Sequence, residues 1–146
     1  DRVKEEQMEI KFVIPGEPKG KGRPQFSARN GKAFARTPEK TVIYENLVRT
    51  EYNQQCPSVR FADDSQLSMR VVAFYSIPKS ARKKRRQQML SGLIRPTKKP
   101  DADNVLKIIA DSLNTIAYRD DAQIVCAAVE KYYTEQPRVE VEIDGE

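Results

Sequence analysis

Residues 67–77 (LSMRVVAFYSI) place the strongest constraint on the fold of this chain. Apolar residues occupy consecutive positions from 71 to 75, so a strand formed here would be apolar on both of its faces. A strand of this kind is buried when it lies in the interior of a sheet rather than at its edge. We therefore expect the segment to lie centrally in a β-sheet and to end at Pro78.

Four further segments have strand patterns. Residues 8–14 (MEIKFVI) alternate in part between polar and apolar positions, and residues 138–143 alternate cleanly. Residues 123–134 predict another strand, which is joined to the last one by the turn residues Glu-Gln-Pro. Residues 25–34 contain the dipeptide Asn-Gly between two short segments, and this predicts a hairpin.

Two segments have amphipathic helix patterns. Thr37-Pro38 resembles an N-cap followed by proline at the first helical position, and it predicts a helix over residues 38–55. A stripe of apolar residues predicts a second helix over residues 103–117, with one side on the core. Apolar side chains of the first helix are expected to cover the sheet, namely Val42, Ile43, Tyr44, Leu47, Val48 and Tyr52.

A short basic helix over residues 80–90, which Ser80 is expected to cap, completes the set of elements. The resulting order, ββαβααββ, predicts the fold class α+β, with a mixed β-sheet packed by two or three helices. A chain of 146 residues is long enough for one modest core and too short for two. We therefore expect a single domain over residues 1–146.

The composition excludes several kinds of active site. The chain has no histidine, so a histidine general base, a Ser-His-Asp triad and a histidine-zinc site are all excluded. Carboxylates remain as strong ligands, and they suit magnesium or manganese. Cys56 and Cys126 are isolated and are interpreted as reduced core thiols. No run of about 20 apolar residues is present, so we expect a cytoplasmic protein without membrane contact.

Charges are segregated along the chain. Residues 79–99 hold nine basic and no acidic residues, and residues 19–40 hold seven basic residues against Glu39, giving local charges of +9 and +6. Residues 101–146 hold eleven acidic and four basic residues, a local charge of −7. Segregated positive charge is typical of a protein that binds a polyanion, although a merely soluble basic surface would give the same counts.

The stretch KKPDADNVLKIIADSLNTIAYRDDAQIV carries the residues that are best suited to chemistry. Asp101 and Asp103 lie at the expected start of a helix, where the helix dipole favours negative charge, and Lys107 lies one turn after Asp103. Asp120 and Asp121 follow the expected end of that helix. A unit of this kind could hold a divalent metal ion.

Each of these acidic residues also has an ordinary structural interpretation. An Asp near a helix start is often an N-cap, and Asp120-Asp121 could form an ordinary turn. Asp111 shares a helix face with Lys107 at i,i+4, so we interpret it as an ion-pair partner and not as a metal ligand. The expected helix is roughly 21 Å long. Asp121 would therefore reach the helix start only through tertiary packing, or the site would be shared with another segment.

Other motif interpretations are weaker. A calcium-binding loop needs a third ligand and a glycine soon after Asp103, but Val105 and Leu106 occupy those positions. An aspartyl-phosphate enzyme needs an apolar strand before its Asp-x-Asp, and here the preceding residues are RPTKKP. A non-catalytic nucleic-acid-binding protein would explain the basic segments but would leave the carboxylates and Lys107 unused. A metal-dependent phosphoryl-transfer enzyme, such as a flap nuclease or other structure-selective nuclease, also remains open.

The combination KPDADNVLKIIADSL followed by AYRDDAQIV resembles the signature of the RusA family of Holliday junction resolvases. That signature is Asp-x-Asp-Asn, a lysine four residues after the second Asp, and a later Asp-Asp-x-Gln-Val, in which Ile124 here replaces valine. The segments PGEPKGKGRPQF and IPKSARKKRRQQ are also similar to segments of family members. The resemblance implies a RusA-like fold and covers most of the chain.

The resemblance also implies a function. Asp101, Asp103 and Asp121 would be Mg²⁺ ligands, Lys107 would be catalytic, and Asp120 would be a candidate for an indirect role beside the metal. Mn²⁺ is expected to replace Mg²⁺, and no small-molecule cofactor is expected. The protein would cut branched DNA at Holliday junctions as a homodimer, with paired phosphodiester cuts in recombination and repair. The residues expected to bind DNA are Lys19, Lys21, Arg23, Lys79, Arg82, Lys83, Lys84, Arg85, Arg86, Lys98 and Lys99.

Overall fold

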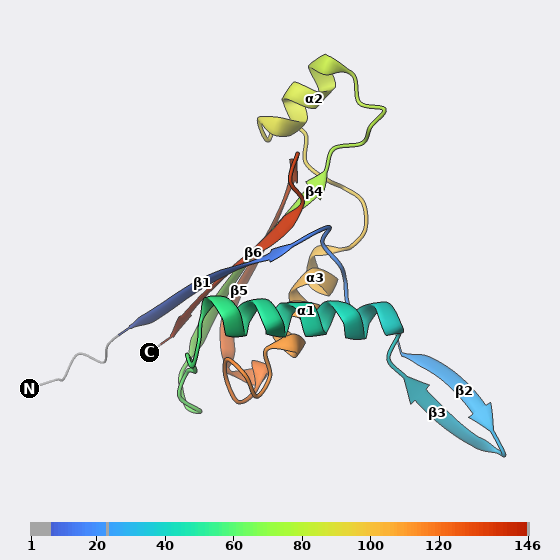
Figure 1. Ribbon diagram of the computed structural model, residues 1–146, viewed down its shortest axis with the longest axis vertical. Helices are drawn as coiled ribbons and strands as arrows, with labels where there is room; N and C mark the ends of the chain where they lie inside the picture. Colours follow the sequence, from blue (N-terminus) through green and yellow to red (C-terminus); the bar gives the residue numbers. More distant parts are fainter. Residues whose placement is uncertain (1–6, 23, 146) are drawn as a thin grey trace, which may run out of the picture.

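The computed structural model describes residues 7–22 and 24–145, which form a four-stranded sheet, a separate two-stranded hairpin and three α-helices (Figure 1). The order of strands in the sheet is β1 (Met8–Pro15), β6 (Arg138–Gly145), β4 (Leu67–Ser76) and β5 (Ile124–Thr134). The β4 strand pairs in parallel with β5 and antiparallel with β6, so the sheet is mixed. The predicted α+β class is confirmed, and β4 lies in the interior of the sheet as predicted.

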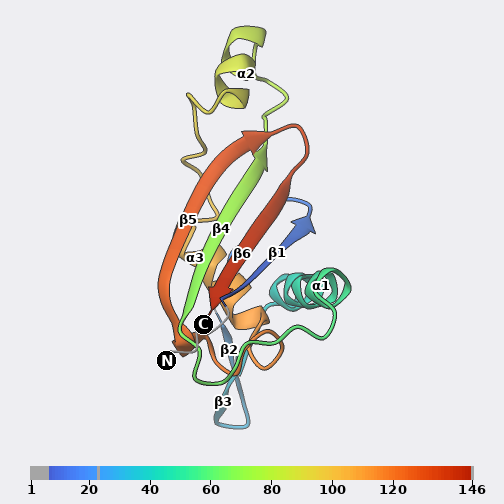
Figure 2. The same cartoon turned by 90° about the vertical axis from the view of Figure 1, so that its left-hand side faces the viewer.

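Helices α1 (Glu39–Gln55) and α3 (Ala102–Ser112) cover one face of this sheet (Figures 1 and 2). The strands present alternate apolar side chains to that face because successive side chains point to opposite sides of a strand. Complete burial of each large aliphatic side chain contributes about 1.5–3 kcal/mol to folding. The core contains, among others, Ile10, Phe12, Ile14, Tyr44, Val48, Tyr52, Leu67, Met69, Val71, Val105, Ile108, Ile109, Val139, Val141 and Ile143.

The opposite face of the sheet carries charged and aromatic side chains. Arg70 pairs with Glu130 across the parallel strands, at 3.0 Å. The ring of Phe74 stacks on that of Tyr132 at 5.9 Å, and the guanidinium of Arg138 lies 4.1 Å from the Phe74 ring centroid. The second apolar face of β4 is therefore covered by neighbouring side chains, including a cation over an aromatic ring.

Helix α1 begins one residue later than predicted. Its N-cap is Pro38, which has extended backbone angles and makes no side-chain capping bond, so the prediction of Thr37 as the N-cap is wrong. Tyr44 is buried as expected, together with Val48 and Tyr52, but Val42 and Ile43 are 42% and 62% exposed. The expectation that the latter two cover the sheet is wrong, because the helix turns the face containing Tyr44 toward the core.

Helix α2 (Lys83–Leu90) begins after Arg82, so the prediction that Ser80 caps it is wrong. Residues 78–81 instead form a turn in which the Ala81 N–H donates to the carbonyl oxygen of Pro78. Among the described residues of α2, Met89 alone is buried. The helix extends beyond the end of the sheet, at the top of Figure 1.

Helix α3 ends at Ser112, five residues before the predicted end. The chain then turns through Thr115, which has a positive φ of 67°. The apolar residues Leu113, Ala117 and Tyr118 remain buried, and the Tyr118 hydroxyl donates to the carbonyl oxygen of Ala110 at 2.6 Å. The apolar stripe is therefore real, but its last part packs from a turn rather than from a helix.

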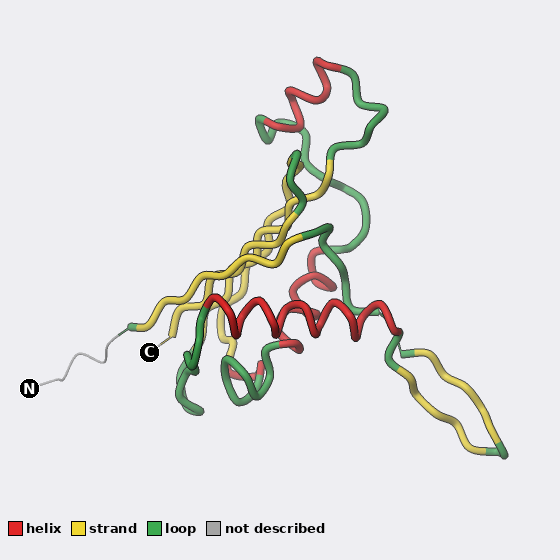
Figure 3. Tube along the Cα trace, viewed as in Figure 1, coloured by secondary structure: helices red, strands yellow, loops and turns green. Residues whose placement is uncertain are grey.

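The predicted hairpin is confirmed as β2 (Gln25–Arg29) and β3 (Lys32–Arg36), which lie apart from the main sheet (Figure 3). The element order therefore contains one strand more than ββαβααββ, because the hairpin contributes two strands after β1. Cys56 is buried as predicted, but Cys126 is exposed on β5, so its assignment to the core is wrong. Within the described residues no helix combines the length and apolar character required to span a membrane.

Candidate nucleic-acid interface and carboxylate site

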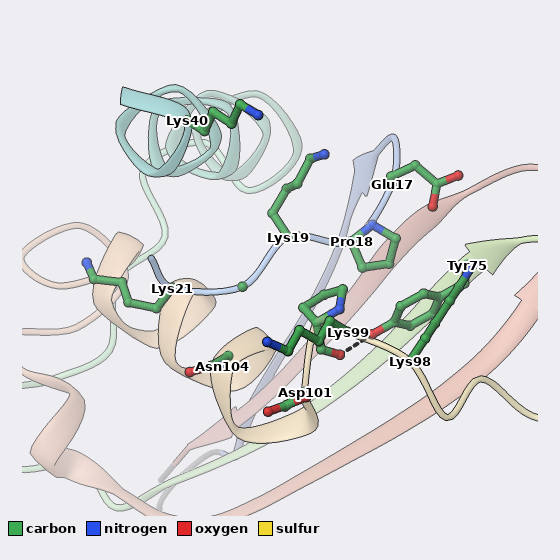
Figure 4. A pocket seen from close by; sticks show the side chains of 12 residues that line it. Glu17, Pro18, Lys19, Lys21, Lys40, Tyr75, Lys98, Lys99, Asp101 and Asn104 are labelled. Atoms are coloured by element: carbon green, nitrogen blue, oxygen red, sulfur yellow. Dashed lines mark hydrogen bonds between the residues drawn. The ribbon is translucent and has the colours of Figure 1, made fainter. Parts of the chain in front are cut away.

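An open cavity of about 1010 Å³ lies at the N-terminal end of α3 (Figure 4). The loop after β1, the start of α1, the end of β4 and the residues around the start of α3 line it. Its described lining includes two acidic residues, Glu17 and Asp101, and five lysines. Such an excess of ammonium groups favours an anionic ligand. The lysines are Lys19, Lys21, Lys40, Lys98 and Lys99.

Two hydrogen bonds hold the loop that leads into α3. The Tyr75 hydroxyl donates to the carbonyl oxygen of Pro100 at 2.6 Å, and the Lys131 ammonium donates to that of Lys98 at 2.7 Å. Burial, with a smaller effect of the Asp101 carboxylate, raises the pKa of Tyr75 to about 12. Burial lowers the pKa of Lys131, and Asp101 opposes that shift. Tyr75 therefore remains a donor at neutral pH and fixes the backbone that precedes Asp101.

The loop after β1 packs directly on the start of α3 at Gly20. A Cβ atom at this position would lie 3.0 Å from the Cβ atoms of both Asn104 and Pro100. The N–H of the next residue, Lys21, donates to the carbonyl oxygen of Asn104 at 3.1 Å. Glycine permits this close approach, which brings the lysines of the loop to the head of α3.

Asp101 and Asp103 stand at the head of α3. Asp101 is the N-cap residue, and its carbonyl oxygen accepts the Val105 N–H at 3.0 Å, but its side chain makes no capping bond. Asp103 is exposed in the first turn. Neither carboxylate forms a side-chain hydrogen bond or ion pair with another described residue. Both are therefore available to a cation, next to amides whose dipole stabilises negative charge.

Asp111 lies near the tail of α3 and contacts two lysines. The Lys107 ammonium is 3.7 Å from its Oδ2, so the predicted ion pair is confirmed. Lys21 reaches the same oxygen at 3.4 Å and also contacts Glu45 Oε1 at 3.2 Å. The sequence did not predict either contact of Lys21. Lys21 therefore links the cavity to the tail of α3.

Asp121 also lies at the tail, in a short 3₁₀ helix, η1 (Asp121–Gln123). Burial, followed by contact with Asp111 and Asp120, raises the pKa of Asp121 to about 6. Asp120 is the N-cap of η1, and its Oδ1 accepts the Ala122 N–H at 2.8 Å. The Asp121 N–H donates to Asn114 Oδ1 at 2.8 Å, which fixes this turn against the end of α3.

The structure thus divides the predicted metal ligands between two places. Asp101 and Asp103 lie at the head of α3, whereas Asp121 contacts Asp111 at its tail. Asp103 and Asp111 are separated by about 12 Å of helix rise. Among the described residues, no group of three or more acidic or thiol side chains is arranged to hold a metal ion. The aspartates of one chain therefore form two separate clusters rather than a single one.

The residues predicted to bind DNA also fall into separate regions. Lys19, Lys21, Lys98 and Lys99 line the cavity. Arg23 lies outside the described residues. The others are on α2 or immediately before it, mostly exposed, namely Lys79, Arg82, Lys83, Lys84, Arg85 and Arg86.

Several residues of this region were not identified from the sequence. Tyr75 lies within an apolar strand, where its pattern is the same as that of a core residue. Lys131 lies in a later strand, and the sequence gives no indication of its contact with residue 98. Lys40 belonged to a basic segment and could have been included on charge alone. Asp111 was assigned to its helical neighbour because its contact with Asp121 depends on tertiary structure.

The fold and this arrangement define a small α+β protein with a cationic cavity beside free carboxylates. The family model described as Endodeoxyribonuclease RusA matches residues 15–144, so the chain belongs to the RusA endodeoxyribonuclease family. A Bacillus subtilis (strain 168) protein, described as uncharacterized protein YqaN, is 42% identical over 136 residues. The match covers 92% of this chain and 94% of that protein.

Proposed function

We propose that this protein is a Mg²⁺-dependent, structure-selective endodeoxyribonuclease whose substrate is the Holliday junction, cut in DNA recombination and repair. The observation that carries the proposal is the combination at the head of α3, where Asp101 lines a cavity together with five lysines. Asp103 lies exposed in the adjoining first turn of the helix. Carboxylates suit a hard cation and lysines suit phosphate. Membership of an endodeoxyribonuclease family supports the same chemistry.

Asp101 and Asp103 would hold Mg²⁺, for which Mn²⁺ would substitute. Magnesium is usually bound through one or two carboxylates, with water and substrate phosphate completing its coordination, and these two side chains fit that requirement. The ion, when bound, supplies Lewis acidity to the phosphate and to water. Asp121 is proposed as a third ligand. Asp120 would act indirectly, because its carboxylate caps the turn that carries Asp121.

The lysines would position the DNA backbone. Lys19, Lys98 and Lys99 line the cavity and would bind phosphates, which makes binding strongly dependent on salt. Lys107 lies one turn after Asp103 with its side chain 62% exposed, and its only ion pair within the described residues is a 3.7 Å contact. It would neutralise charge that develops on the scissile phosphate. Oriented binding of this kind lowers the barrier because it fixes the reacting groups before reaction.

A homodimer is part of the proposal. A Holliday junction is close to two-fold symmetric and requires two cuts, which a symmetric dimer with one site per cut would provide. The edge strand β5 offers a surface for a second copy, since residues 125–128 are exposed and Val125 is 65% exposed. Sedimentation should give the mass of two chains, and a Val125→Lys variant should weaken that association.

The division of the carboxylates between head and tail makes subunit mixing informative. Asp103→Asn and Asp121→Asn variants are each expected to be inactive alone. If two subunits share a site, a mixed dimer contains one intact site and regains cleavage. If each subunit builds its own site, the mixed dimer stays inactive. Mixing wild-type subunits with either variant controls for exchange.

A panel of DNA substrates tests the proposal. Wild-type protein in Mg²⁺ should cut a synthetic four-way junction with paired, symmetric nicks, and EDTA should stop the reaction. Linear duplex of the same sequence should be bound but not cut. Equal cleavage of linear duplex would contradict the junction claim. Faster cleavage of a flap would favour another structure-selective nuclease. Binding without any cleavage would favour a non-catalytic nucleic-acid-binding protein.

A further inference from the structure

The β2–β3 hairpin is a part of the chain that the proposed site does not use. Within residues 7–22 and 24–145, its strands pair with each other and with no other strand, from Gln25 opposite Arg36 to Arg29 opposite Lys32. Asn30 and Gly31 form the tip, and both have positive φ angles, of 53° and 74°. The hairpin extends away from the sheet beyond the N-terminal end of α1 (Figures 1 and 3).

The register gives the hairpin two chemically different faces. Residues directly opposite each other in an antiparallel pair project from the same face, and successive residues alternate. One face therefore carries Arg29, Lys32, Phe34 and Arg36. The other carries Phe26, Ala28, Ala33 and Ala35. Positive charge is thus concentrated on a single face.

The basic face has the properties of a nucleic-acid contact. Residues 25–36 contain three basic and no acidic residues, and every described side chain in this range is exposed. Phe34 is 50% exposed and lies between Lys32 and Arg36 on that face. Cations that contact phosphates and an aromatic ring that stacks on a base form the usual combination for binding unpaired nucleotides.

The base of the hairpin is joined to the cavity. The Gly22 N–H donates to Thr41 Oγ1 at 3.2 Å, and a Cβ atom at Gly22 would lie 2.6 Å from that oxygen. The preceding Lys21 is held by Glu45 and Asp111. The first strand of the hairpin therefore begins four residues after Lys21, which lines the cavity, and its second strand ends shortly before α1 and the cavity residue Lys40.

We propose that the β2–β3 hairpin is a DNA-binding arm of the enzyme. Arg29, Lys32 and Arg36 contact phosphates, and the Phe34 ring stacks on an unpaired base at the branch point. This inference rests on the proposed function, because it takes branched DNA as the ligand of the adjacent cavity. It adds a second contact, which recognises the opened bases of the junction rather than its duplex arms.

The test measures the affinity for a four-way junction as a function of salt, in EDTA so that no cleavage occurs. Replacing Arg29, Lys32 and Arg36 together by Ala removes three phosphate contacts, so the slope of log affinity against log salt should fall by about 2.7. Phe34→Ala should weaken junction binding by about 5- to 100-fold, with a much smaller effect on linear duplex. Phe26→Ala, on the opposite face, is the matched control and should bind as wild type.

Stacking is tested separately with 2-aminopurine at the branch point. Wild-type protein should change its fluorescence, and Phe34→Leu, which keeps an apolar side chain without an aromatic ring, should lose most of that change. A Phe34→Leu variant with the wild-type signal would overturn the stacking contact. If the triple variant keeps the wild-type affinity and salt slope, the hairpin is not a DNA-binding arm. The same conclusion would follow if the triple variant lost self-association but still bound DNA as wild type. Wild-type cleavage of the junction, measured in parallel in Mg²⁺, separates a failure of the arm from a failure of the proposed function.

Discussion

The two ends of α3 carry the same residue types and use them differently. At the head, the carboxylates of Asp101 and Asp103 form no hydrogen bond or ion pair with another described side chain, and five lysines line an open cavity. At the tail, the side chains of Asp111 and Asp121 are in contact, and Lys21 forms ion pairs with Glu45 and Asp111. Free charges can bind a ligand, whereas paired charges fix a structure. The head therefore has the chemistry of a binding site, whereas the contacts of the tail fix the position of Asp121, the proposed third ligand.

Lys107 lies between the two ends, and its replacement should have the largest effect. If it acts on the scissile phosphate, Lys107→Met should lower the single-turnover cleavage rate by about 100-fold or more. Junction affinity should change little, because Lys107 is one of many cations. Lys107→Arg keeps the charge and should retain part of the rate. If Lys107→Met cuts at the wild-type rate, Lys107 is only an ion-pair partner of Asp111 and belongs to the tail.

Lys21 links the two ends, so its replacement should affect stability. Among the described residues, Lys21→Met leaves the buried Glu45 with its 3.6 Å contact to Arg49 and leaves Asp111 with its ion pair to Lys107. We expect a loss of about 1–3 kcal/mol in the free energy of unfolding, measured by urea denaturation. Lys40→Met is the matched control, since Lys40 is exposed in the same cavity. It should weaken DNA binding without a change in stability, and equal destabilisation by both would remove the distinction.

Asp121 should make stability depend on pH. Its pKa is about 6 in the folded protein, above the value near 4 of an unfolded chain. The folded state therefore binds the proton more tightly than the unfolded state. As pH rises from about 4 through 6, loss of this proton lowers the free energy of unfolding, and the full destabilisation is present above about pH 6. Asp121→Asn should raise the melting temperature in EDTA at pH 8 and have less effect at pH 4. The same gain at both values would contradict the raised pKa.

Tyr75 should give the smallest effect. Tyr75→Phe removes the hydrogen bond to Pro100 and should cost about 0.5–1.5 kcal/mol of stability. The rate of cleavage should fall only a few-fold, because the backbone before Asp101 loses one hydrogen bond while the Asp101 carboxylate remains. Tyr44→Phe is the control, since the buried Tyr44 hydroxyl has no hydrogen-bond partner among the described residues. It should be neutral or stabilising, and a larger loss for Tyr44 than for Tyr75 would contradict this account.

The strands and the head of α3 could be predicted because their signals are local. Alternation fixes the inward side of β1 and β6, and the positions of Asp101 and Asp103 at a helix start follow from a polar segment before an apolar stripe. The exposure of Val42 and Ile43 could not be predicted, since it depends on which side of α1 meets the sheet. Local patterns do not contain that information.

The tail of α3 could not be predicted because its contacts depend on the path of the chain. The contact between Asp111 and Asp121 requires α3 to end at Ser112 and the chain to turn at Thr115. The position of Lys21 depends on the close approach of Gly20 to the start of α3. A glycine in a basic loop reads as flexibility from the sequence, whereas here it permits close packing.

Cleavage of a four-way junction by Asp103→Asn tests the central claim most directly. Asp64→Asn, which changes an exposed acidic residue in a turn, is the matched control. We predict that Asp103→Asn binds the junction as tightly as wild type but cuts it at least about 100-fold more slowly in Mg²⁺, while Asp64→Asn is fully active. Cleavage by Asp103→Asn at the wild-type rate would contradict the assignment of the head of α3 as the catalytic centre.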